Sequence, residues 1–223
     1  MDFYFIYTND DINDSNVNVK TGLNINKSKK FMVNNFSEDK MNNFTDSTVN
    51  FTDKTVSKYK YIRIISVPSK DNEIYSFGYS IYVNKLISSD RYYLYDPLTI
   101  KRFNIKVNAS FAKGACANGA VKFLEWWKNS GLKLEYDHTN INSASGYGHV
   151  NVLTWWRNSG LELKYTEYAL NEASFNGHIN VLEWWKNSGL ELKYSQKTIH
   201  KSVIPACNIS VLKWWANSGL LKD

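Results

Sequence analysis

The chain repeats one short phrase four times, and this repetition restricts its fold more than any other feature does. The first copy reads Val-Lys-Phe-Leu-Glu-Trp-Trp-Lys-Asn-Ser-Gly-Leu at residues 121–132. All eight tryptophans of the 223-residue chain occur in four adjacent pairs, which are Trp126/Trp127, Trp155/Trp156, Trp184/Trp185 and Trp214/Trp215. Successive pairs are 29, 29 and 30 residues apart. A fixed period of this size is typical of a stacked array of repeats.

Alignment on the tryptophan pairs divides the second half of the chain into four repeats. Repeats 1 to 4 are residues 108–136, 137–165, 166–194 and 195–223. Each begins with a residue that can cap a helix, namely Asn108, Asp137, Thr166 and Ser195. A glycine at 119, 148 and 177 is expected to end this first helix. A second helix then runs through the tryptophan pair to Asn-Ser-Gly, so we predict an α-solenoid of helix-turn-helix repeats over 103–223.

The tryptophan pairs have two possible roles. They could form an aromatic platform on which bases or sugars stack. However, the apolar positions of each second helix cover an arc too wide for a helix that buries one narrow stripe. We therefore predict that all eight tryptophans belong to the core of the array.

One segment of the third repeat resembles a known family. Residues 177–189 read Gly-His-Ile-Asn-Val-Leu-Glu-Trp-Trp-Lys-Asn-Ser-Gly and resemble the second-helix half of an ankyrin repeat. The paired tryptophans and the Asn-, Lys-, Ile- and Tyr-rich composition are similar to ankyrin-repeat proteins of giant, mimivirus-like DNA viruses that infect amoebae. The repeats of this chain are 29 residues long, whereas an ankyrin repeat has about 33. The chain also lacks the Thr-Pro-Leu-His sequence with which the first helix of an ankyrin repeat starts. The fourth repeat also has Pro-Ala-Cys-Asn at 205–208 in place of Gly-His.

Residues 1–102 have a different texture and are predicted to form a small β-rich α+β unit. We expect strands at 3–7 and 58–67, one or two more within 74–87, and a helix capped by Asp96 with Pro97 at its first position. Residues 8–57 are rich in Asn, Asp, Ser, Thr and Lys, which predicts partly loop or disordered structure. One hypothesis for this unit is that it covers the exposed end of the array.

Several classes of function have little support in the sequence. The net charge of +6 is scattered rather than clustered, which argues against a nucleic-acid partner. No segment has the roughly 20 apolar residues that would span a membrane. Cys116 and Cys207 are three repeats apart, too far for a disulfide, which indicates reduced thiols and an intracellular setting. His149 and His178 are expected to bond a neighbouring loop, and we predict no metal, no cofactor and no enzymatic activity.

The positions at which the repeats differ are the candidate binding surface. On the exposed side of the first helices these are His138, Thr139, Asn142, Glu167, Tyr168, Asn171, Gln196, Lys197 and His200. The family resemblance implies that this side lines a concave surface that grips a partner. We therefore predict a monomeric, non-enzymatic protein-protein interaction module with a host or viral protein partner, in the host cytoplasm if the chain is viral.

Two alternatives remain open at this point. A nucleic-acid binder would use the basic residues Lys113, Lys122, Lys128, Arg157, Lys186 and Lys213. A virion structural protein would use the array as a building element.

Overall fold

The structure is a computed structural model of the whole chain, and it describes residues 2–8, 22–25, 31–34, 59–68, 74–77, 80–194 and 209–220. The chain divides into two compact units, Met1–Ser110 and Phe111–Asp223. This division lies a few residues beyond the boundary predicted at 102/103. Among the described residues, helices cover more of the chain than strands do, and every strand precedes Pro97. The coarse prediction of a mainly α chain with a smaller β-rich N-terminal part is confirmed.

The N-terminal unit contains two antiparallel sheets. In the larger sheet β4 pairs with β1 along one edge and with β7 and β8 along the other, and β2 lies beyond β7. Its strands are β1 (Asp2–Thr8), β2 (Gly22–Ile25), β4 (Tyr61–Val67), β7 (Lys85–Ser88) and β8 (Tyr92–Tyr93). The smaller sheet has the order β3 (Phe31–Asn34), β6 (Ser80–Val83) and β5 (Ile74–Phe77).

The strand predictions for this unit were partly right. The strands expected at 3–7 and within 58–67 are confirmed as β1 and β4. The stretch 74–87 contains three strands, β5, β6 and β7, rather than one or two. Residues 8–57, predicted as partly loop, hold the last residue of β1 together with β2 and β3, and the remainder of that stretch lies outside the described residues.

A short helix, α1 (Pro97–Arg102), follows β8 as the sequence predicted. The Asp96 side chain accepts a hydrogen bond from the Leu98 backbone N–H at 3.0 Å, and Pro97 stands in the first turn. Proline suits this position because its fixed φ matches the helix and no N–H is required there. The expected Asp-Pro helix start is therefore confirmed.

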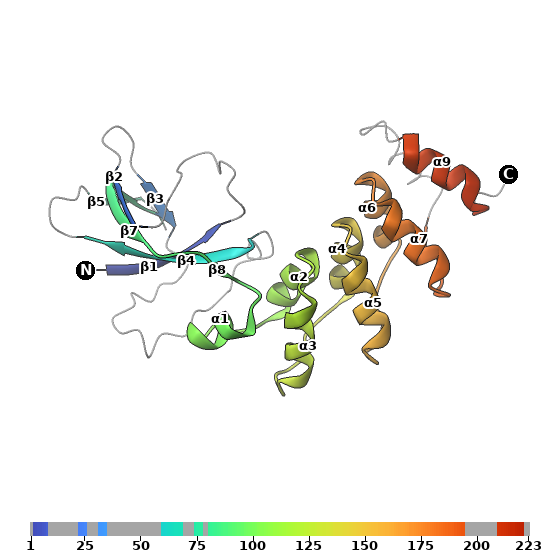
Figure 1. Cartoon of the computed structure of the whole chain (residues 1–223), viewed down its shortest axis with the longest axis horizontal. Helices are drawn as coiled ribbons and strands as arrows, with labels where there is room; N and C mark the ends of the chain where they lie inside the picture. The colour runs from blue at the N-terminus through green and yellow to red at the C-terminus, as the bar shows by residue number, and fades with distance from the viewer. Residues whose placement is uncertain are drawn as a thin grey trace. The chain divides into compact units, whose positions relative to one another are not determined.

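The C-terminal unit is built from pairs of helices that follow the sequence repeats. The first helices are α2 (Ala109–Ala117), α4 (His138–Gly146) and α6 (Tyr168–Phe175). The second helices are α3 (Val121–Asn129), α5 (Val150–Asn158), α7 (Ile179–Asn187) and α9 (Ile209–Ser218). The first helices lie side by side in one row and the second helices in another (Figure 1). The first helix expected in the fourth repeat falls in 195–208, outside the described residues.

Recurring residues end the first helices of repeats 1 to 3 and the second helices of all four repeats. Gly119, Gly148 and Gly177 have φ values of 69°, 81° and 79°, the left-handed conformation that glycine adopts at little cost. The serine of Asn-Ser-Gly donates its hydroxyl to the carbonyl of the second tryptophan and accepts from the N–H two residues later. This pair of bonds occurs at Ser130, Ser159, Ser188 and Ser218. The Asn-Ser-Gly phrase is therefore a helix stop.

The tryptophan pairs divide into two kinds. The second member of each pair is no more than 2% exposed, at Trp127, Trp156, Trp185 and Trp215. Of the first members, Trp155 and Trp214 are buried, while Trp126 and Trp184 are only partly buried. The prediction that all eight tryptophans lie in the core is thus wrong for Trp126 and Trp184, because the first tryptophan of each pair lies at the margin of the helix interface.

Candidate functional site

In repeats 2 to 4, the second tryptophan of the pair joins its repeat to the preceding one. Each indole N–H donates to a side chain on the first helix one repeat earlier. The bonds are Trp156 to Cys116 Sγ at 3.4 Å, Trp185 to Ser145 Oγ at 3.1 Å and Trp215 to Ser174 Oγ at 3.0 Å. The three acceptors occupy equivalent positions, 29 residues apart. A large apolar ring and a paired N–H together fix the spacing of neighbouring helix pairs.

The first tryptophan of each pair makes a parallel connection between second helices. Trp155, Trp184 and Trp214 donate their indole N–H to the residue before the preceding tryptophan pair. The acceptors are Glu125 Oε2 at 2.7 Å, Thr154 Oγ1 at 3.0 Å and Glu183 Oε1 at 2.5 Å. The bond from Trp155, with a further one from Asn129, lowers the pKa of Glu125, because both stabilise the carboxylate.

In each repeat a turn joins the first helix to the second helix. A glycine of one such turn contacts a histidine of the same turn in the next repeat. The ring of His149 lies against Gly119, and the ring of His178 lies against Gly148, so that an added Cβ on either glycine would meet Nδ1 at 2.8 Å. His149 Nε2 is also 2.9 Å from the carbonyl oxygen of Ala117. Placement against a neighbouring turn agrees with the structural role expected for these histidines.

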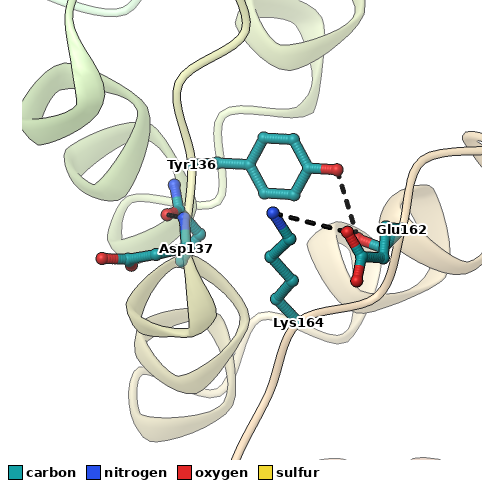
Figure 2. A network of polar contacts seen from close by, with 5 residues as sticks. Tyr136, Asp137, Glu162 and Lys164 are labelled. Carbon is teal, nitrogen blue, oxygen red and sulfur yellow. Dashed lines mark hydrogen bonds and ion pairs between the residues drawn. The ribbon is translucent and has the colours of Figure 1, made fainter.

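The connectors between repeats are held by a tyrosine, a lysine and a glutamate. The Tyr136 hydroxyl donates to the Glu162 carbonyl at 3.3 Å, and Lys164 lies 3.4 Å from the Glu162 carboxylate (Figure 2). The Lys164 ammonium also lies 4.9 Å from the Tyr136 ring centroid, a cation–π contact. The next connector repeats all three contacts, using Tyr165, Glu191 and Lys193. These recurring residues belong to the scaffold.

The predicted helix caps have different outcomes. The Asp137 carboxylate accepts from the Thr139 N–H at 2.8 Å, and the Asn140 side chain accepts from the Asp137 N–H at 3.1 Å, a capping box. The Thr166 hydroxyl accepts from the Tyr168 N–H at 3.3 Å. Asn108 directly precedes α2, and Ser195 lies outside the described residues.

A groove crosses the first helices of the first three repeats. Its volume is about 680 Å³, and side chains of α2, α4, α6 and the adjoining turns line it. The lining residues are Lys113, His138, Thr139, Asn142, Ser143, Gly146, Tyr147, Tyr168, Glu172, Asn176 and His178. This is the side on which the repeats vary in sequence, so we take the groove as the candidate functional site.

The groove includes part of the predicted binding set. His138, Thr139, Asn142 and Tyr168 line it, whereas Glu167 and Asn171 are outside its lining. Glu167 lies just before α6, at the end of the helix rather than along its groove face. The fourth-repeat members of the set, Gln196, Lys197 and His200, lie outside the described residues.

Asn142 corrects the prediction of a freely exposed surface residue. Its side chain is 8% exposed, its amide donates to Thr166 Oγ1 at 2.8 Å, and its oxygen accepts from the Thr166 N–H at 3.2 Å. Asn142 therefore ties α4 to the start of the next repeat. It shapes the groove floor, but its polar atoms are already engaged by the scaffold.

The comparison of the repeats with one another missed several residues that line the groove. Tyr147 and Glu172 were overlooked because they fall outside the few helix positions chosen for comparison. Their positions nevertheless vary between repeats, with Tyr147 aligned to Asn118 and Asn176, and Glu172 aligned to Ser143 and Gly114. A comparison of every position of the first helix and its following turn would have found both.

Cys116 is a free, buried thiol in the described part of the chain. Among the described residues, no group of three or more His, Cys, Asp or Glu side chains could hold a metal ion. Burial raises the pKa of the Cys116 thiol to about 12, and a thiol that does not ionise is a poor nucleophile. No helix within the described ranges has the length and apolarity needed to cross a bilayer.

Comparison with known proteins adds no family to this description. No protein-family model matches the chain, and no curated protein matches it.

Proposed function

We propose that residues 103–223 form an ankyrin-like α-solenoid and that the chain is a non-enzymatic protein-binding module. Two observations support the solenoid. The same two indole bonds join repeats 2, 3 and 4 to the repeat before each of them. The same tyrosine bond recurs from each connector to the next segment of the chain. A structure assembled from repeated nearest-neighbour contacts behaves as a rigid one-dimensional stack.

The contrast between scaffold and groove carries the functional proposal. Most residues that hold the repeats together recur from copy to copy, whereas most residues that line the groove differ between copies. The lining residues that recur, Asn142, Asn176 and His178, are those that also hold neighbouring repeats together. A surface required only for packing would repeat along with the packing. A varied polar and aromatic surface on a repeated scaffold is how a repeat protein recognises a specific partner.

The partner in this proposal is a host or viral protein. The resemblance of residues 177–189 to ankyrin repeats of giant amoeba-infecting viruses motivates that choice, with the host cytoplasm as the setting. In this proposal the chain acts as a monomer. Its groove, at about 680 Å³, would receive a few side chains of the partner rather than the whole interface.

A nucleic-acid role is the second candidate, and the basic side chains argue against it. Lys128, Arg157 and Lys186 occupy the last turn of successive second helices. A cation at this place stabilises the helix through its dipole, and Lys128 also donates to the Ser159 carbonyl. These charges therefore have a structural explanation that needs no phosphate. A structural role in a virion would imply nothing about which residues line the groove.

Affinity capture with matched variants tests the proposal. The full chain is expressed with a tag in amoeba cells and compared with a Tyr147→Ala/Tyr168→Ala variant, since both rings are more than half exposed in the groove. Phe175→Ala is the control, because Phe175 is an exposed aromatic residue of α6 outside the groove. We expect a captured protein that resists nuclease treatment, persists with the control and falls about tenfold or more with the double variant. Capture that is equal for all three chains, or lost on nuclease treatment, would refute the proposal.

A further inference from the structure

The groove lies over α4, which presents small residues beside larger ones on α6. Its lining residues Thr139, Asn142, Ser143 and Gly146 follow the spacing of one helix face, and all four are small. The aligned residues of α6 are Tyr168, Asn171, Glu172 and Phe175, three of them much larger. The face of α4 is therefore the floor, α6 supplies one wall, and the Lys113 side chain of α2 lines the opposite side.

One wall carries a carboxylate that the scaffold does not use. A Cβ added to Gly146 would lie 3.0 Å from the Glu172 Cβ, so the stem of Glu172 rests directly on the glycine. The Asn176 amide donates to the Gly146 carbonyl at 2.8 Å and keeps the two helices together at this point. Glu172 is exposed, and within the described part of the chain its carboxylate has no hydrogen bond or ion pair.

Two exposed tyrosine rings accompany this carboxylate. Tyr168 lies one helical turn before Glu172 on α6 and is 58% exposed. Tyr147 directly follows Gly146 and is 62% exposed. A carboxylate with aromatic rings nearby suits an arginine, because a guanidinium binds a carboxylate through two parallel hydrogen bonds and stacks on aromatic faces. A lysine would gain less from this arrangement, because its ammonium is compact and strongly hydrated.

The opposite wall has the reverse charge. Lys113 projects from α2, and His138 stands at the start of α4. The nearby Asp137 carboxylate is engaged by Thr139, whose hydrogen bond is the largest cause of its lowered pKa, with weaker contributions from the charges of His138 and Lys113. Because Asp137 already serves as a helix cap, the lysine remains available to a carboxylate brought by a partner.

We propose that the groove binds an extended segment of the partner protein, placing an arginine at Glu172 and a carboxylate at Lys113. The inference rests on the proposed protein-binding function and gives it a chemical specificity. The two residues are on helices two places apart, which at 8–10 Å per neighbour is roughly 16–20 Å. An extended chain covers this span in about five or six residues. The arginine and the acidic residue therefore lie within about six positions of each other.

Selection from a displayed library of random short peptides, using the full chain as bait, tests this chemistry. The selected peptides are expected to be enriched in arginine, with Asp or Glu within about six positions of it. Affinity for a selected synthetic peptide is then measured by fluorescence anisotropy. Glu172→Gln should weaken binding about tenfold or more, while Glu167→Gln, an exposed carboxylate outside the groove, should change it less than about twofold.

A charge swap makes the test specific to the proposed contacts. Glu172→Lys should abolish binding of the arginine peptide and restore it for a peptide carrying glutamate in place of that arginine. Lys113→Glu should act in the same way on the acidic residue of the peptide. Glu172 is exposed and Lys113 is half-buried, so the melting temperature of each variant is measured beside that of the parent to show that the variant is folded under the binding conditions.

The outcomes separate this inference from the proposed function. Peptides whose binding depends on Tyr147 and Tyr168 but is unchanged by Glu172→Gln and Lys113→Glu would overturn the arginine and carboxylate assignment, while the protein-binding module stands. A library that yields no groove-dependent peptide, with capture of a protein still lost in the tyrosine variant, would also overturn the assignment alone. Peptides with the expected charges and a successful charge swap would support it.

Discussion

At the scale of single residues, the indole N–H groups decide how the repeats are spaced. Trp156, Trp185 and Trp215 each donate to the first helix of the preceding repeat. Trp127 is equally buried, but its N–H has no acceptor among the described residues. Trp127 belongs to the first repeat, and no helix pair that could supply the equivalent serine or cysteine precedes this repeat in the described part of the chain.

This difference predicts unequal costs for the same substitution. Trp185→Phe removes a buried hydrogen bond and leaves Ser145 without its donor, whereas Trp127→Phe removes a donor that has no described acceptor. The loss of packed volume is similar at the two fully buried sites. We expect Trp185→Phe to lower the free energy of unfolding by about 1 kcal/mol more than Trp127→Phe. Urea unfolding of both variants measures this, and equal losses would contradict the indole account.

The cap residue Asp137 predicts a pH dependence. Folding lowers its pKa below the usual 3.8, chiefly through the Thr139 hydrogen bond, because that bond stabilises the charged form. A depressed folded pKa gives stability that is present above the unfolded value and is lost as pH falls through the folded value. Asp137→Asn keeps a capping oxygen but cannot titrate, so its melting temperature should fall less between neutral pH and pH values below 3.8. Parallel melting curves for variant and parent would contradict this assignment.

At the scale of helices and turns, the sequence predicted what lies within one repeat better than what lies between repeats. The capping residue Asp137 and the closing Gly148 could be recognised because local backbone needs select their residue types. Asn142 was misjudged because its burial depends on Thr166, the first residue of the next repeat. The groove was also only partly predicted, since its depth comes from small residues on α4 beside larger ones on α6.

Two glycines of the second repeat, one after each of its helices, provide a matched test of contact between repeats. Gly148 and Gly160 have similar left-handed φ values of 81° and 75°, but only Gly148 faces a close neighbour, His178. Alanine at either position should cost about 1–2 kcal/mol of conformational strain. Gly148→Ala should cost a further 1–3 kcal/mol or so, because the histidine must move. Chemical unfolding of both variants gives the difference.

A second substitution checks the origin of that extra cost. When His178→Ala is combined with Gly148→Ala, the clash disappears, so the double variant should lose less than the sum of the single losses. Additive losses would mean that the histidine does not explain the constraint on Gly148.

At the scale of the whole molecule, the C-terminal unit separates support from recognition. The second helices and connectors carry recurring bonds, while the first helices present small, charged and aromatic residues that differ between repeats. A protein-binding module of this kind should contact its partner through α2, α4 and α6 and leave the exposed side of α5 and α7 free. This division is the central claim of the proposed function.

Site-specific photo-crosslinking in cells tests that claim most directly. A photoreactive amino acid is placed in the groove at Tyr147 or Tyr168, or on the second helices at the exposed Arg157 or Lys186. We predict a discrete crosslinked protein from both groove positions and none from the two second-helix positions. Crosslinks obtained only at Arg157 and Lys186, or a crosslinked product that nuclease destroys, would contradict the account.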